Sequence, residues 1–96
     1  MNAFVYILEC ADGSLYTGWT DNPVARLEAH NNKSGAKYTR SRTPVSLVYL
    51  EQCEDKRAAL RREAKIKKLT RTQKLALIEA NKQSVEKAQH MLGFFI

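Results

Sequence analysis

The 96-residue sequence predicts an α+β domain, with a small three-stranded, mostly antiparallel sheet flanked by helices in the order ββαβαα. Three observations predict this class: two apolar runs that meet at an Asp-Gly pair, a later β-branched run, and three polar stretches that begin with helix-capping residues. The length suits one hydrophobic core. We therefore expect one domain over residues 1–82, followed by a C-terminal tail over 83–96. The tail could form a short helix that docks on the domain, mediate self-association or fray.

The first two strands are expected in "VYILECADGSLYTGW", which carries a tyrosine in each apolar run. A two-residue turn at Asp12-Gly13 would pair Tyr16 with Glu9 and put Tyr6 and Tyr16 on opposite faces of the sheet. A three-residue loop with Gly13 in the left-handed conformation shifts the pairing by one and brings both rings to one face. We predict this longer turn or an equivalent bulge, although aromatic residues in strands often only pack on a half-buried surface.

The first helix is expected over 23–31, because the Asp-Asn-Pro sequence at its start supplies a cap and a first-turn proline. Arg26 and His30 are four residues apart and so share one face of this helix. An arginine can bind two phosphate oxygens at once, and a histidine can exchange a proton near neutral pH. Each residue taken alone could simply be a surface side chain.

The remaining elements follow in order. "KSGAKYTRSRTP", residues 33–44, predicts a polar, basic loop, and the β-branched run over 45–53 predicts the third strand. The next helix is expected over 54–69, with acids at its start and bases at its end as the helix dipole prefers. Thr70 can cap a last helix over 71–81.

Glu63 is the residue of the helix predicted over 54–69 that does not fit an amphipathic pattern. At about 100° per residue it falls within the apolar stripe that contains Ala59 and Ile66. A carboxylate directed toward the protein body is costly unless it is paired or binds a metal. The sequence leaves two explanations: an ion pair with Lys56 or Lys67, or a site for a hard cation such as Mg²⁺.

The net charge of +6 favours an anionic partner, and nucleic acid is the commonest one for a small basic protein. The excess lies in two patches. Residues 56–74 carry nine Lys or Arg against one acid, and residues 21–44 carry five against two. The alternative is that both patches only keep the protein soluble.

Other classes of protein fit the sequence poorly. No apolar run approaches the roughly 20 residues that span a bilayer, and the start lacks the features of a signal peptide, so we expect a cytoplasmic protein without a membrane partner. Cys10 and Cys53 lie in apolar runs without further ligands at metal-binding spacing, so we expect reduced thiols and no zinc site.

Two short triplets complete the pattern: "VYI" at 5–7 and "YTG" at 16–18, about ten residues apart on the predicted hairpin. Arg26 and His30 follow on the next helix, and Glu63 comes later within "RREAKIKKL". In this order and spacing the residues resemble the GIY-YIG nuclease superfamily, and specifically its small stand-alone bacterial members. The resemblance covers residues 3 to 80.

The chain departs from the family's pattern at three points. Val5 stands where the first triplet has glycine, and Thr17 stands where the second has isoleucine. Many family members also have a late asparagine. Asn81 is the residue available here, but it lies far from Glu63 in the sequence, and we assign it no role.

The resemblance implies a metal-dependent endonuclease that hydrolyses phosphodiester bonds, in DNA above all, with little sequence specificity. Tyr16, assisted by Tyr6, would activate water, and Glu63 would hold Mg²⁺ or Mn²⁺. Arg26 would clamp the phosphate, and His30 would position water or move a proton. A nuclease-like fold kept only for binding DNA or RNA is the alternative. In either case we expect these residues to contact nucleic acid: Lys33, Lys37, Tyr38, Arg40, Arg42, Arg61, Lys65 and Lys68.

Overall fold

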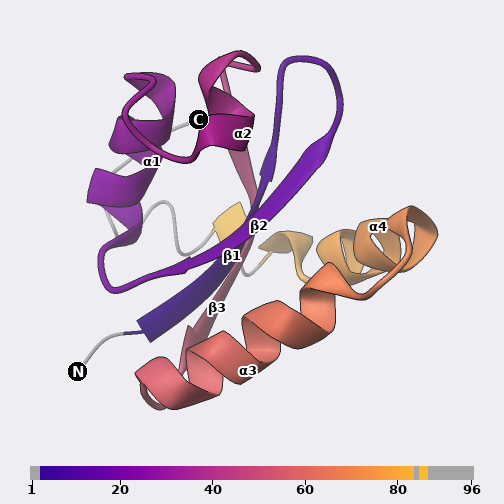
Figure 1. Cartoon of the computed structure of the whole chain (residues 1–96). Helices are drawn as coiled ribbons and strands as arrows, with labels where there is room; N and C mark the ends of the chain where they lie inside the picture. The colour runs from indigo at the N-terminus through magenta and orange to yellow at the C-terminus, as the bar shows by residue number, and fades with distance from the viewer. Residues whose placement is uncertain (1–2, 84, 87–96) are drawn as a thin grey trace.

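The computed structural model describes residues 3–83, 85 and 86, and its core is one antiparallel sheet in the strand order β2-β1-β3 (Figure 1). The strands are β1 (Ala3–Glu9), β2 (Leu15–Thr20) and β3 (Ser46–Cys53). This confirms the predicted α+β class with a three-stranded sheet. β1 is the central strand, so β2 and β3 form the two edges.

Four helices join and follow the strands: α1 (Pro23–Asn31), α2 (Lys37–Arg40), α3 (Lys56–Lys67) and α4 (Arg71–Ala80). The short helix α2 lies inside the segment for which the sequence predicted only a loop, so the order becomes ββααβαα. A single turn of four residues is too short to leave a helical pattern in the sequence.

α1 and α4 begin at the predicted residues, whereas α3 begins at Lys56, two residues later than expected, because Asp55 caps it from outside. Asn22 accepts a hydrogen bond from the backbone N–H of Ala25, and Asp55 does the same for Ala58. Thr70 and Gln73 form a capping box at the start of α4. These bonds satisfy backbone donors that a helix start would otherwise leave without partners.

Helices cover both faces of the sheet, with α1 and α2 on one side and α3 and α4 on the other (Figure 1). The middle of β1 is therefore buried in both directions, which explains its unbroken apolar sequence. The core cluster on the α1 side contains Tyr6, Leu8, Cys10, Leu27, Val45, Leu47, Leu50 and Val85. The cluster on the α3 side contains Ala3, Val5, Ile7, Tyr49, Ala59 and Ile66.

A bulge in β3 lets neighbouring side chains fill both clusters. Ile7 is opposite Tyr49, whereas Leu8 is opposite Leu47, so Val48 is an extra residue in the ladder. As a result, Leu47 packs on the α1 side and Tyr49 on the α3 side. In a regular strand these two residues would share one face.

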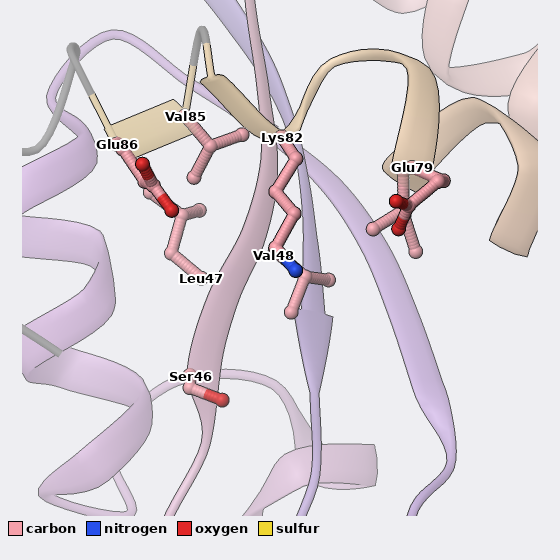
Figure 2. A pocket seen from close by; sticks show the side chains of 8 residues that line it. Ser46, Leu47, Val48, Glu79, Lys82, Val85 and Glu86 are labelled. Atoms are coloured by element: carbon pink, nitrogen blue, oxygen red, sulfur yellow. The ribbon is translucent and has the colours of Figure 1, made fainter.

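The last described residues pack beside the edge strand β3. Residues 82–83 and 85–86 are helical, and Val85 is buried in the cluster on the α1 side. They border a hollow of about 390 Å³ that is also lined by β3 and α4, with Glu79 and Lys82 at its rim (Figure 2). The boundary between domain and tail at residue 82 stays a prediction, and the apolar end of the tail, 91–96, lies outside the described residues.

The described helices include none that is both long and apolar enough to cross a membrane. In α4, Leu77 and Ile78 pack against the cluster on the α3 side, whereas Leu75 is 43% exposed.

Candidate active site

The β1–β2 turn has the predicted length. The N–H of Cys10 donates to the carbonyl of Ser14, and the N–H of Gly13 donates to the carbonyl of Cys10, which leaves Ala11, Asp12 and Gly13 as the loop. Gly13 has a φ of +83°, a conformation that glycine adopts without steric cost. The prediction of a three-residue loop with left-handed Gly13 is confirmed.

This turn places the two tyrosines on one face of the sheet. Tyr6 is opposite Gly18 and Tyr16 is opposite Leu8, so these four residues share a side. The ring centroids of Tyr6 and Tyr16 are 6.4 Å apart. The side that they share is the one covered by α1, where Arg26 and His30 lie.

The hydroxyl of Tyr6 is buried between two side chains of α1. It lies 2.9 Å from Nε2 of His30 and accepts a hydrogen bond from Nε of Arg26 at 3.4 Å. Gly18 makes room for it, because a Cβ at that position would lie 2.5 Å from the hydroxyl oxygen. Burial raises the pKa of Tyr6 although the Arg26 guanidinium lowers it, so Tyr6 is protonated near neutral pH.

His30 is fully buried, and Thr39 on α2 fixes which of its ring nitrogens carries the proton. The hydroxyl of Thr39 donates to the carbonyl of Ala36, so its oxygen accepts from Nδ1 of His30 at 2.7 Å. Nε2 is then free to accept the proton of the Tyr6 hydroxyl. Burial, assisted by the charge of Arg26, lowers the pKa of His30 to about 4, which keeps the imidazole neutral at pH 7.

Tyr16 is the more accessible of the two hairpin tyrosines. It is half-buried, with its ring 5.3 Å from that of His30 and stacked at 5.9 Å on the ring of Tyr38. The hydrogen bond to Tyr6 and, less strongly, the side chain of Tyr16 raise the pKa of Arg26, so its guanidinium stays charged between them. Tyr16 also lines a groove of about 240 Å³ along β2, which Leu15, Thr17, Tyr38, Lys67 and Lys74 complete.

Glu63 reaches this region from the other face of the sheet. Its helix packs through Ala59 and Ile66 on the α3 side, yet the Glu63 charge still contributes to the raised pKa of Tyr6. The side chain of Glu63 is 16% exposed, and its Oε2 lies 3.7 Å from Nζ of Lys67. Of the two ion pairs that the sequence left open, the structure contains the one with Lys67.

The donor set around Glu63 suits a lightly held cation. The described residues contain no group of three or more His, Cys, Asp or Glu side chains that could hold a metal ion. Mg²⁺ does not need such a group, because it keeps several waters and commonly uses one or two carboxylates together with substrate phosphates. A single carboxylate beside Lys67, which lines the groove, fits that mode.

The structure divides the predicted nucleic-acid contacts between several surfaces. Tyr38 and Arg42 lie beside Tyr16, where the Arg42 guanidinium is 4.0 Å above the centre of the Tyr38 ring. Arg61 and Lys65 instead line a hollow of about 360 Å³ with residues of β3, at the opposite edge of the sheet from Tyr16. The remaining predicted contacts are exposed around α2 or after α3: Lys33, Lys37, Arg40 and Lys68.

Three further residues of this region were not among those predicted from the sequence to form the site. Thr39 binds His30, and Lys67 and Lys74 line the groove beside Tyr16. Thr39 lies in the segment predicted as a loop, where nothing in the sequence indicates a contact with a histidine nine residues earlier. Both lysines belong to the dense basic stretch, in which sequence alone does not separate those that face the tyrosines from those that do not.

Comparisons with known proteins agree with this arrangement. A family model described as the GIY-YIG catalytic domain matches residues 2–76. The chain is 64% identical over 77 residues to the UPF0213 protein CPE1444 of Clostridium perfringens, covering 80% of this chain and 83% of that protein. It is 57% identical over 79 residues to a UPF0213 protein of Syntrophus aciditrophicus, covering 81% and 91%.

A solved structure is similar over the same region. The solution NMR structure of the UPF0213 protein BH0048 from Bacillus halodurans matches with a TM-score of 0.57 and 44% sequence identity. The match covers 85% of this chain and 87% of that one.

Proposed function

We propose, since the chain belongs to the GIY-YIG catalytic domain family, that it hydrolyses phosphodiester bonds in nucleic acid, with DNA as the preferred substrate and little sequence specificity. The family is a nuclease superfamily, which supports the general activity. The observation that carries the proposal is the convergence of Tyr6, Tyr16, Arg26 and His30 on one face of the sheet. A purely structural role would not require both tyrosines to surround one charged guanidinium.

Tyr16 is the residue that we propose to accept a proton from the attacking water, because its side chain lines the groove while Tyr6 is 3% exposed. Tyr6 then acts behind it as a positioning residue. Its oxygen accepts from Arg26 while its proton is held by neutral His30. This arrangement keeps the guanidinium in place to stabilise negative charge on the phosphate in the transition state.

We propose Mg²⁺ or Mn²⁺ as the cofactor and Glu63 as the residue that would hold it. When bound, such an ion supplies positive charge to the phosphoryl and leaving oxygens. The Lys67 ammonium beside Glu63 is 54% exposed and can move to solvent or to a phosphate, which would free the carboxylate.

The alternative is a nuclease-like domain that binds nucleic acid without cutting it. The ion pair between Glu63 and Lys67 favours this alternative, because it gives the carboxylate a structural partner. The two functions differ in whether cleavage occurs at all, so an activity assay separates them.

The test is to incubate the purified protein with labelled single-stranded, duplex, nicked and branched DNA and with RNA, in Mg²⁺, Mn²⁺ or EDTA. We expect metal-dependent cleavage that Glu63→Gln abolishes while binding stays equal or becomes tighter, because the change removes a metal ligand and a negative charge. Glu79→Gln is the matched control, since Glu79 lies at the hollow of Figure 2, away from the tyrosines. Undiminished cleavage by Glu63→Gln would refute the metal role, and binding without cleavage by the unmodified protein would establish the alternative.

A further inference from the structure

The groove beside Tyr16 has walls from three helices and a floor from β2. Tyr38 of α2 forms one wall, Lys67 of α3 and Lys74 of α4 form the other, and Leu15 and Thr17 contribute from the strand. Because β2 is an edge strand, the groove follows the border of the sheet. Its volume of about 240 Å³ is below the roughly 300–1,000 Å³ of most small-molecule pockets, so it suits one phosphate and its sugar rather than a whole cofactor.

The charges in the groove are positive and only partly compensated. Lys74 is half-buried, and no acidic side chain among the described residues forms an ion pair with it. Lys67 has a partner in Glu63, but at 3.7 Å this is a long contact and the lysine is more than half exposed. A half-buried ammonium group without a counter-charge is stabilised when an anion binds beside it.

Thr17 supplies an independent observation. Thr17 lines the groove and is 4% exposed, and its Oγ1 has no hydrogen-bond partner among the residues that the structure describes. A buried hydroxyl without a partner costs free energy, so such groups are rare unless a ligand or water satisfies them. This threonine also occupies the position where the family signature has an apolar isoleucine.

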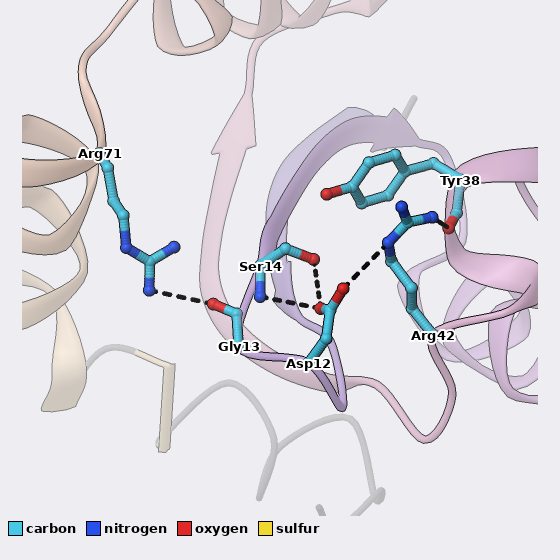
Figure 3. A network of polar contacts seen from close by, with 6 residues as sticks. All are labelled: Asp12, Gly13, Ser14, Tyr38, Arg42 and Arg71. Atoms are coloured by element: carbon cyan, nitrogen blue, oxygen red, sulfur yellow. Dashed lines mark hydrogen bonds and ion pairs between the residues drawn. The ribbon is translucent and has the colours of Figure 1, made fainter.

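Two hydrogen bonds connect the β1–β2 turn to the segments on either side of the groove. Figure 3 shows Nη2 of Arg71 donating to the carbonyl of Gly13 at 3.0 Å, and Nε of Arg42 donating to the Asp12 carboxylate at 3.1 Å. The first bond ties the turn to α4 and the second ties it to the segment after α2. These bonds link the turn to the elements that carry the walls, and backbone that is ordered before a ligand arrives lowers the entropy cost of binding.

We propose that this groove binds a backbone phosphate of the nucleic-acid strand, one position away from the bond that is cut at Tyr16. The proposal rests on the proposed function and extends it to a second phosphate subsite. Two ammonium groups and a hydroxyl donor match the oxygens of a phosphate. The Tyr38 ring already contacts Tyr16 at 5.9 Å and the Arg42 guanidinium at 4.0 Å, so it serves as a wall rather than as a platform for a base. The subsite therefore contacts the phosphate backbone and makes no base contact that would depend on sequence.

The test combines unfolding with binding of a fluorescein-labelled eight-nucleotide oligothymidylate in EDTA, so that no cleavage occurs. Thr17→Val keeps the shape of the side chain and removes a hydroxyl that has no partner among the described residues, so we expect unchanged or increased stability. Its affinity should nevertheless fall by about twofold to tenfold, the value of one net hydrogen bond. A residue with a purely structural role would not combine these two effects.

Lys74→Gln is the second variant, and Lys82→Gln is its control with the same change in charge at the hollow of Figure 2. Loss of one phosphate contact should flatten the dependence of log affinity on log salt by about 0.7 for a single strand, whereas the control should keep its slope. The subsite is wrong if Thr17→Val binds like the unmodified protein, or if both lysine variants change equally. Failure of the unmodified protein to bind or cleave any nucleic acid would refute the proposed function as well.

Discussion

Replacing His30 by glutamine should remove a large part of the dependence of stability on pH. His30 is fully buried, and its pKa is about 4 in the folded protein against 6.5 when free. Between these two values the unfolded chain binds a proton that the folded protein does not, so stability rises with pH across this window. The free energy of unfolding should therefore fall by about 1.4 kcal/mol per pH unit, or about 3 kcal/mol in total, as pH falls from about 6.5 to 4. A small domain has only about 5–15 kcal/mol of stability, so the effect is large enough to measure.

The assay is urea unfolding of the unmodified protein and of His30→Gln at pH 7, 6, 5 and 4, with the free energy extrapolated to water at each pH. The glutamine variant loses the Tyr6 and Thr39 hydrogen bonds of the imidazole and will be less stable at pH 7. The informative quantity is the difference between the two proteins, because all other groups titrate in both. This difference should shrink by about 3 kcal/mol from pH 7 to 4. A difference that stays constant would show that His30 has the same pKa in the folded and unfolded protein, which would refute the lowered pKa that keeps it a neutral acceptor for Tyr6.

Two further substitutions test the contacts around this histidine. Thr39→Val leaves the Nδ1 proton of His30 without an acceptor, so the free energy of unfolding in urea should fall by about 1–3 kcal/mol. Long-range ¹⁵N NMR should then show a changed His30 tautomer. Thr39→Ser should restore both the stability and the tautomer, and an unchanged tautomer in Thr39→Val would contradict the assignment. Gly18→Ala places a Cβ 2.5 Å from the Tyr6 hydroxyl, so overpacking should lower the free energy of unfolding by about 1–3 kcal/mol. The Tyr6 ring signals in NMR spectra should also shift. Wild-type stability would mean that the tyrosine does not pack against β2.

Most of the fold could be predicted because its signals are local. Asn22, Asp55 and Thr70 stand at helix starts where their side chains can accept backbone N–H bonds. The turn at Gly13 could be predicted by asking which loop length puts two tyrosines on one face. These features depend on residues within a few positions of one another.

The parts that the sequence did not reveal depend on contacts between distant segments. Arg61 and Lys67 belong to one basic helix, but α3 lies across the sheet, so Lys67 reaches the groove at β2 while Arg61 faces the side of β3. Helical periodicity defines the angle between these residues but not the direction of either one relative to the strands. The partner of His30 was missed for the same reason, since Thr39 is placed by the path of the chain between α1 and β3.

The β1–β2 hairpin has an alternative strand pairing that differs from the observed register by one residue. In the competing arrangement Asp12 and Gly13 alone would close the turn, Tyr16 would lie opposite Glu9, and its ring would emerge on the side of α3. The two arrangements use the same residues, and the contacts of the Asp12 carboxylate with Ser14 and Arg42 stabilise the observed one. The presence of both tyrosines in the sequence therefore does not by itself decide which face of the sheet each ring occupies. A chain carrying Asp12→Asn, which strengthens the two-residue alternative, would keep Tyr6, Tyr16, Arg26 and His30 and still populate a conformer with Tyr16 on the other face of the sheet.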